Sequence, residues 1–276
     1  MEFIASPVIP ALDLITPLPQ KEWDLFQQIL RANMNVFHCT LSEFEFSNKS
    51  LLDIAYPQQW TTTYQMQILV HMLSARHSDI LQTENAAFAP PIFCSAINDI
   101  WDDFNKCGKK KKDSFVWPQE LIDIVLCLGK KWMEDIYTIY TPMLWNQSHW
   151  VGLAINLDMG LVEVLDPLPT LNGARRMAKW MKPVLACLPY LVRKVANCEL
   201  TQFTGFKPFI CNRIPDIYIN TRSGDCGPVT MKFLELHSHG DTSPGMAGIT
   251  DQIVDDMRKQ YAMDIYKTMV LPAYYD

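Results

Sequence analysis

The sequence predicts an α+β fold in which a central, mainly antiparallel sheet is flanked by helices. One observation behind this prediction is a group of segments rich in β-branched and aromatic residues, at 135–144, 149–155 and 161–166, because this composition is typical of strands. A second observation is that segments with apolar residues at helical spacing lie on both sides of this group.

The remaining elements follow from the same patterns. Helices are expected at 21–34, 61–75, 95–104, 119–130, 171–192, 226–237 and 250–267. The helix from 171 contains Pro183, which can break it, and the last helix begins with a Thr250/Asp251 cap. A short strand is expected at 216–220 and a loop at 74–93, while 40–57 stays unassigned.

The composition is that of a globular protein. Of 276 residues, 49% are hydrophobic and 20% are charged, so one large domain, or a domain with an extension, can bury a sizeable core. The net charge of −6 disfavours non-specific nucleic-acid binding, which needs a basic surface. The apolar runs are too short for a membrane span and the N-terminus does not resemble a signal peptide. We therefore expect an intracellular, nuclear or cytoplasmic protein, with neither nucleic acid nor membrane as a partner.

Cysteine spacing argues against a metal site. Eight cysteines are present without a C-x-x-C pair, so we expect no structural zinc and no cofactor. The lysine-rich run 106–112 is the one dense charge block. It is either a solvated loop, a nuclear-import signal or a contact for an acidic partner.

Strands 149–155 and 161–166 are expected to pair as a hairpin, because they are close neighbours in sequence. With a loop at 156–159, the opposite pairs would be Ile155–Gly160, Leu153–Val162, Val151–Val164 and His149–Asp166. Opposite residues share a face, with β-carbons roughly 5 Å apart. One apolar face then ends in a histidine–carboxylate pair, although a slip of one residue would separate the two. The alternative is a surface histidine beside an unrelated aspartate.

A cysteine stands at an expected helix start. In Ser223–Pro228, Gly224 permits a sharp turn and Asp225 is a good N-cap, so Cys226 would lie at the helix N-terminus. The partial positive charge there stabilises a thiolate, and the free N–H groups can face a developing oxyanion. A histidine oriented by a carboxylate would complete the activation of the nucleophile. A structural cysteine in a turn is the simpler alternative.

The ordered set of these residues resembles a known family. His149-Trp150, Asp166 seventeen residues later, and Gly224-Asp225-Cys226-Gly227 are similar to the signatures of the ubiquitin-like-protein-specific cysteine proteases, which include SUMO proteases and their adenoviral and bacterial-effector relatives. The proline-rich character resembles versions carried by plant mobile elements. The resemblance implies a papain-like fold, an N-terminal arm or added subdomain at 1–50, and a catalytic domain at 51–276.

The resemblance also implies roles for individual residues. Cys226 would be the nucleophile, His149 the general base and Asp166 its orienter. Trp60 and Trp150 would be aromatic walls of a narrow tunnel for an extended Gly-Gly tail, with Gly227 beside them, although both tryptophans could simply pack in the core. The substrate would be SUMO, ubiquitin or a related modifier, cleaved after its C-terminal Gly-Gly from conjugates or precursors.

Two positions depart from the family pattern. Asn220 stands where the family has a glutamine that supplies an oxyanion donor, and its side chain is one methylene shorter. The W-L-x-D segment reads Trp60-Thr61-Thr62-Thr63, without the acidic residue that would contact a basic tail. Two alternatives to the protease stay open: an acyltransferase with a similar triad, and a weakly active module that only binds a modifier.

Overall fold

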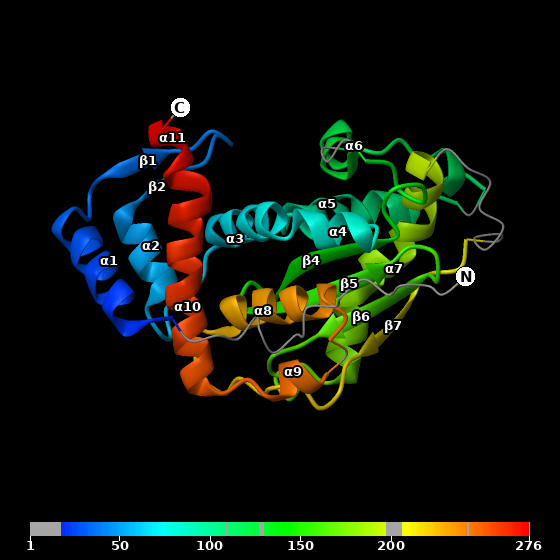
Figure 1. Cartoon of the computed structure of the whole chain (residues 1–276). Coiled ribbons are helices and arrows are strands. Elements are labelled where there is room, and N and C mark those ends of the chain that lie inside the picture. Colours follow the sequence, from blue (N-terminus) through cyan, green and yellow to red (C-terminus); the bar gives the residue numbers. More distant parts are fainter. Residues whose placement is uncertain (1–17, 109, 127–129, 197–205, 242, 276) are drawn as a thin grey trace, which may run out of the picture.

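A five-stranded sheet forms the centre of the protein in the computed structural model, which describes residues 18–275 except 109, 127–129, 197–205 and 242. The strand order is β3-β4-β5-β6-β7 (Figure 1). The strands are β3 (Ala86–Phe88), β4 (Thr138–Trp145), β5 (His149–Asn156), β6 (Leu161–Leu165) and β7 (Ile210–Arg213). Antiparallel pairing joins β4, β5 and β6, whereas each edge strand runs parallel to its neighbour. The α+β class is confirmed, with antiparallel pairing confined to the central strands.

Helices cover both faces of the sheet (Figure 1). One face packs against α5 (Ile92–Lys106), α6 (Gln119–Leu126) and α7 (Ala174–Ala196), and the other against α3 (Thr63–Arg76) and α8 (Cys226–Ser238). Because both faces are covered, seven of the eight residues of β5 are buried, which explains its nearly continuous apolar sequence.

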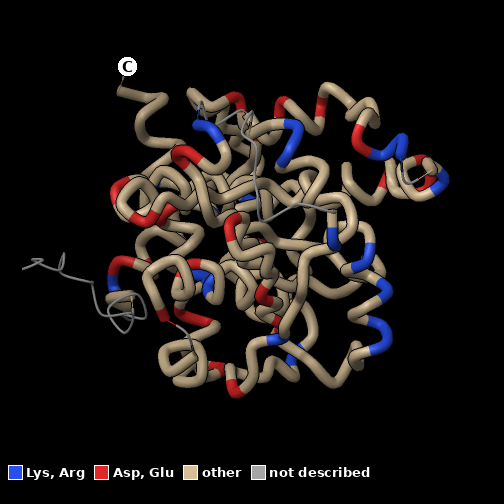
Figure 2. Tube along the Cα trace, turned by 90° about the vertical axis from the view of Figure 1, so that its right-hand side faces the viewer, with Lys and Arg blue, Asp and Glu red and all other residues tan. Residues whose placement is uncertain are grey.

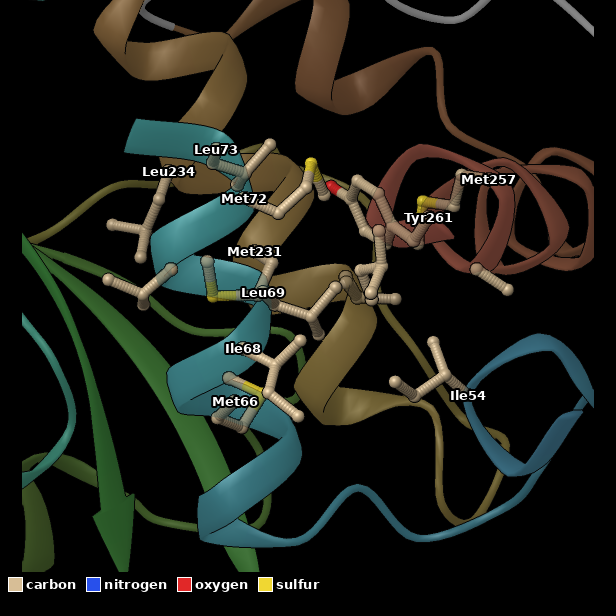
Figure 3. Packing of buried hydrophobic residues seen from close by; sticks show 14 of the residues in the cluster. Ile54, Met66, Ile68, Leu69, Met72, Leu73, Met231, Leu234, Met257 and Tyr261 are labelled. Carbon is tan, nitrogen blue, oxygen red and sulfur yellow. The ribbon is translucent and has the colours of Figure 1, made fainter. Parts of the chain in front are cut away.

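The N-terminal and C-terminal segments pack together beside α3 (Figure 1). The first part contains α1 (Gln20–Ala32), β1 (Phe37–Cys39), β2 (Glu45–Ser47) and α2 (Asn48–Ala55), and the last part contains α10 (Asp251–Ile265), the π-helical turn Tyr266–Val270 and α11 (Pro272–Tyr275). Figure 3 shows Ile54 of α2, Met66 to Leu73 of α3 and Tyr261 of α10 around one apolar core. Residues of α1 such as Leu30, which is fully buried, belong to the same core. Of the N-terminal arm or added subdomain expected at 1–50, residues 1–17 lie outside the described part of the chain.

The predicted helices are present, but three local expectations were wrong. Residues 216–220 form no strand, because Asp216 has a φ of 57° and the segment bonds to loops instead. The loop predicted at 74–93 contains α4 (Ser78–Thr83) and β3. The helix α7 continues through Pro183, whose buried ring packs in the core with its neighbours, so tertiary packing outweighs the lost backbone hydrogen bond. The Thr250 cap is confirmed, since its side chain accepts a hydrogen bond from the Ile253 N–H.

The described lysines of the 106–112 run lie at the surface, with Lys106, Lys110 and Lys111 exposed. Lys112 places its ammonium 4.4 Å from the centre of the Phe104 ring. Figure 2 shows basic positions along one side of the trace. None of the helices in the described part of the chain has the length and apolar character needed to cross a bilayer.

Candidate active site

The turn that precedes α8 places a cysteine at the first residue of that helix. Cys226 is 7% exposed, and Gly224 has a φ of 83°, a left-handed conformation that glycine adopts without strain. A Cβ atom on Gly224 would lie 2.3 Å from the Gln58 carbonyl oxygen. The turn therefore needs glycine both for its backbone angle and for its close approach to the segment before α3. The partial positive charge at the N-terminus of α8 lies beside the sulfur of this cysteine.

Asp225 holds this turn in place, but not as the predicted N-cap, because its side chain makes no capping hydrogen bond. Its Oδ1 atom accepts hydrogen bonds from the Gln58 N–H at 2.8 Å and from Arg258 at 3.0 Å, and its Oδ2 atom accepts one from Arg222 at 2.7 Å. Arg258 also donates to the Asp53 and Gln59 carbonyls. A buried carboxylate with several charged donors is costly to leave unpaired, so the arginines tie the cysteine turn to the 58–60 segment.

His149 begins β5 and lies between an acid and the cysteine. Its Nε2 atom is 2.7 Å from Asp166 Oδ1, and the hydrogen-bonding and charge effects of Cys226 also act on its ring. Because Nε2 is occupied by Asp166, Nδ1 is the ring nitrogen that remains for the sulfur. Burial lowers the pKa of His149, but the hydrogen bonds and charges of Asp166 and Cys226 outweigh burial and raise it to about 9.

Asp166 follows β6 and is fully buried. Its Oδ1 atom also accepts a hydrogen bond from the Leu168 N–H at 2.9 Å, while Arg213 approaches Oδ2 to 2.9 Å. The side chain is therefore fixed from three directions.

The hairpin brings His149 and Asp166 together in a register that differs from the predicted one. The β5–β6 ladder closes at Asn156↔Leu161 and pairs Leu153 with Val164, whereas Leu153 was expected opposite Val162. The loop therefore starts one residue later, and the register shifts by two. An even shift keeps each side chain on its face, so the two residues still meet, diagonally rather than directly opposite.

A cleft of about 330 Å³ opens over these residues. Trp60, with 41% of its surface exposed, forms part of the wall. The other lining residues are Gln147, Ser148, His149, Leu168, Leu171, Asn220, Arg222, Ser223, Gly224 and Cys226. Cys226 thus lies in a cleft lined by one aromatic side chain, two leucines and several polar or charged side chains.

Two residues expected in the cleft wall lie behind it instead. Trp150 is 1% exposed, and its indole N–H donates to the Thr61 carbonyl at 3.0 Å. A Cβ atom on Gly227 would lie 2.9 Å from the Thr61 Cβ. Neither residue lines the cleft. Successive strand residues point to opposite faces, so Trp150 is directed into the α8 side of the core while His149 faces the cysteine. Both residues therefore position the Trp60 segment through their contacts with Thr61.

Asn220 lines the cleft, but its amide is engaged locally. The Nδ2 group donates to the Arg222 carbonyl at 3.1 Å, and Oδ1 accepts from the Arg222 N–H at the same distance. The Asn220 N–H donates to the Pro167 carbonyl at 2.7 Å. One Nδ2 hydrogen remains available, since the amide nitrogen carries two.

Sequence reasoning did not identify Arg213 and Arg258. Arg213 lies in a segment without a clear pattern. A signal was present for Arg258, because it shares one helical face with Val254, Met257 and Tyr261, all buried. An arginine on the apolar face of a helix indicates a buried ion pair, and Asp225 is its partner.

The Ulp1 protease family, C-terminal catalytic domain, has a family model that matches residues 59–273. The chain belongs to the Ulp1 protease family. This membership confirms the predicted family, the papain-like α+β fold and the prediction of a cysteine-type peptidase. The match begins beside Trp60 and extends beyond α10, so it includes every residue that lines the cleft.

Solved structures of the Ulp1 family share this fold. The C-terminal Ulp1 protease domain in complex with Smt3, the yeast ortholog of SUMO, is 16% identical with a TM-score of 0.66, and the alignment covers 92% of this chain and 97% of that one. The catalytic domain of the Ulp1-like SUMO protease of Chaetomium thermophilum is 17% identical with a TM-score of 0.58, over 92% and 91% of the two chains. Comparison with curated proteins gave no match.

Proposed function

We propose that this protein cleaves the bond after the C-terminal Gly-Gly of SUMO or a related modifier such as ubiquitin, with Cys226 as nucleophile, His149 as general base and Asp166 as its orienter. The observation that carries the proposal is the position of the imidazole, which binds Asp166 through Nε2 and lines the same cleft as Cys226. A raised His149 pKa favours an imidazolium at neutral pH, and an imidazolium beside a cysteine is a common way of activating the nucleophile.

The reaction follows from this geometry. Cys226 gives its proton to His149, and the thiolate attacks the carbonyl carbon of the terminal glycine. The N–H of Cys226 at the start of α8 stabilises the resulting oxyanion. His149 then returns the proton to the leaving amine, which leaves a thioester on Cys226. Water, activated by the same imidazole, hydrolyses the thioester and frees the modifier.

Asn220 is proposed as the second oxyanion donor. Its remaining Nδ2 hydrogen is supported for this role by its place in the cleft lining and by the bonds to Arg222 that hold the amide. A shorter side chain than glutamine is compensated if the backbone brings it closer. The hydrogen bond between the Asn220 N–H and Pro167, directly after Asp166, supports such a placement.

The cleft also supports a glycine-selective tail site. Trp60 can approach the backbone of a glycine on one side because no side chain separates them. Trp150 and Gly227 contribute by holding Thr61, the residue after Trp60. Cleavage after Gly-Gly is thus attributed to the Trp60 wall rather than to charged contacts, since the family's acidic residue after the tryptophan is absent from Trp60–Thr63.

We also propose an intracellular, nuclear or cytoplasmic location. The described cysteines are free, and burial raises the pKa of the Cys94 and Cys187 thiols to about 12, which keeps them protonated and inert. Free thiols in this number suit a reducing compartment.

The N-terminal region, 1–50, is proposed to be an addition to the catalytic domain at 51–276 that contributes to the choice of modifier. Deleting it would not test this idea cleanly, because Trp23, Leu30 and Phe46 lie in the main core. Phe37 and Leu41, which are 69% and 64% exposed, are better sites. The double substitution F37S/L41S should change the ratio of cleavage rates between SUMO and ubiquitin substrates. An unchanged ratio would remove the idea.

Covalent trapping tests the proposed function. SUMO and ubiquitin carrying a thiol-reactive group in place of the C-terminal carboxylate are incubated with the wild type, with C226A and with C39A, which removes an exposed cysteine outside the cleft. A modifier-sized gel shift in the wild type and C39A, absent in C226A, is expected. If no modifier is captured while iodoacetamide still labels Cys226, the protein has a reactive thiol but another acyl substrate.

A further inference from the structure

The guanidinium of Arg213 joins the proposed triad to the wall of the cleft. Its Nη2 atom lies 2.9 Å from Asp166 Oδ2 and donates to the Asn172 carbonyl at 2.6 Å. Its Nη1 atom donates to the Pro169 carbonyl at 3.3 Å. One side chain on the edge strand β7 thus contacts the buried acid and two carbonyls of the loop that follows it.

The contact with Asp166 is an ion pair rather than a directed hydrogen bond. Oδ2 accepts no well-aligned hydrogen bond from the described residues, whereas Oδ1 accepts two, from His149 and from the Leu168 N–H. The carboxylate therefore uses one oxygen for the histidine and the loop, and presents the other to a fixed positive charge. Because its two oxygens have different partners, the Asp166 carboxylate is fixed in the orientation that binds His149.

Arg213 neutralises the charge that remains on the proposed triad, because the other charges beside Cys226, those of Asp225, Asp255, Arg222 and Arg258, balance one another. In the reactive state Asp166 and Cys226 are negative and His149 is positive, so these three buried groups carry a net charge of −1. Arg213, whose side chain is 19% exposed, brings the sum to zero. Formation of a thiolate in a partly desolvated site is favoured by such a cation, because an uncompensated buried anion is costly.

The loop that Arg213 binds carries part of the cleft wall. Leu168 and Leu171 line the cleft. Each is followed directly by a residue, Pro169 or Asn172, whose carbonyl accepts a hydrogen bond from Arg213. A planar guanidinium can bind a carboxylate and two carbonyls at once, whereas a lysine ammonium is a single point charge. Charge and loop geometry are therefore separable by substitution.

We propose that Arg213 is a positioning residue that both favours the Cys226 thiolate through Asp166 and sets the apolar wall formed by Leu168 and Leu171. This inference rests on the proposed function of the triad. The alkylation rate of Cys226 rises with pH along an acid limb. The inference predicts that R213Q shifts this limb to a pH about one unit higher. R213K should keep the wild-type limb but raise KM for a modifier substrate several-fold.

The test measures alkylation of Cys226 by iodoacetamide across pH 5–9, resolved from the other cysteines by peptide mass spectrometry, together with kcat and KM on the modifier that is captured. R193Q is the matched control, because Arg193 is exposed and its ion pair with Asp113 lies away from the cleft. An upward limb in R213Q alone, with a KM effect in R213K, supports the proposal. R213Q with the limb and KM of R193Q overturns it.

Two further readouts keep the result interpretable. Thermal unfolding of each variant separates a folding defect from the pH effect, and if R213Q does not fold, R213M and R213K carry the comparison. H149A separates this inference from the proposed function. If H149A leaves the alkylation limb of Cys226 unchanged, the triad itself is wrong. If H149A moves the limb and R213Q does not, only the role of Arg213 fails.

Discussion

The Nε2 atom of His149 lies 2.7 Å from Oδ1 of Asp166, although the two residues are not opposite one another in the β5–β6 ladder. The imidazole reaches the acid diagonally, at the end of the hairpin where β6 gives way to a loop. The Leu168 N–H binds the same carboxylate oxygen. The geometry of the site therefore depends on the loop after β6 as much as on the strand pairing itself.

The raised pKa of His149 predicts the pH dependence of the enzyme. An imidazolium with a pKa of about 9 persists through neutral pH, so kcat/KM should fall as pH rises through about 9. The same shift contributes stability that is fully present below the ordinary histidine pKa and is lost between roughly 6.5 and 9. A kcat/KM profile and urea unfolding at several pH values check both statements. A profile that falls already near pH 6.5 would contradict them.

Replacing Asp166 by asparagine should separate orientation from charge. D166N keeps the shape of the side chain but removes the charge that favours the imidazolium, so we expect kcat to fall by about 10²–10⁴. The basic limb of the pH profile should move to lower pH. Both effects are measured by steady-state kinetics, with the precursor of the modifier identified by covalent trapping as the substrate. If D166N retains kcat within a few-fold, the orienting role is wrong.

Gly224 and Gly240 form a matched pair of left-handed glycines, with φ angles of 83° and 84°. Both alanine variants bear the backbone strain of about 1–2 kcal/mol. Only G224A also drives a Cβ atom into the Gln58 carbonyl, since nothing lies within 4 Å of the corresponding position on Gly240. G224A should therefore lose more unfolding free energy than G240A, and also activity. Equal losses in denaturant unfolding would show that the close approach does not matter.

Arg258 should be a major contributor to stability through its fully buried pair with Asp225. Burial lowers the pKa of Arg258 to about 10 against the opposing charge of Asp225. R258M leaves that aspartate with Arg222 as its arginine partner, so we expect a loss of about 3–5 kcal/mol in urea unfolding. The double variant R258M/D225N should recover part of the loss. Strictly additive losses in the two single variants would contradict a coupled pair.

Asn220 should affect kcat more than KM. In N220D the oxygen that accepts from the Arg222 N–H remains, but the amide donor is lost, so a fall of about 10²–10³ in kcat is expected with little change in KM. N220A controls for the added negative charge and should show a similar loss. N220Q should keep substantial activity. If all three match the wild type, the oxyanion is stabilised without this side chain.

The positions of the proposed triad could be predicted largely because they carry local chemical patterns. The Gly224-Asp225-Cys226 turn predicts its own geometry, and the strand patterns around 149–166 place a histidine and an aspartate on one face. The predicted register was off by two residues, since loop chemistry at 156–160 allows two closely related hairpins. The prediction that His149 and Asp166 share a face still held, because side chains alternate with a period of two and the shift was even.

The parts that could not be predicted depend on contacts distant in sequence. Asp225 reads as a cap from its neighbours, yet Arg258 and Gln58 capture its carboxylate in the folded chain. The family resemblance implied that Trp150 is a cleft wall, yet alternation along β5 directs it into the core on the α8 side of the sheet. Pro183 reads as a helix break, yet α7 gains enough by packing on the sheet to continue. Each difference is a case in which tertiary packing overrides a local preference.

The bonds from Arg258 to Asp225 and to the Asp53 and Gln59 carbonyls have a consequence for synthesis on the ribosome. Arg258 can add its bonds between the cysteine turn and the Trp60 segment only after residue 258 has emerged from the ribosome. A nascent protein would thus carry its cysteine, histidine and aspartate for some time without these bonds. We therefore expect fragments that stop before α10 to hold the cleft less firmly than a chain that includes it.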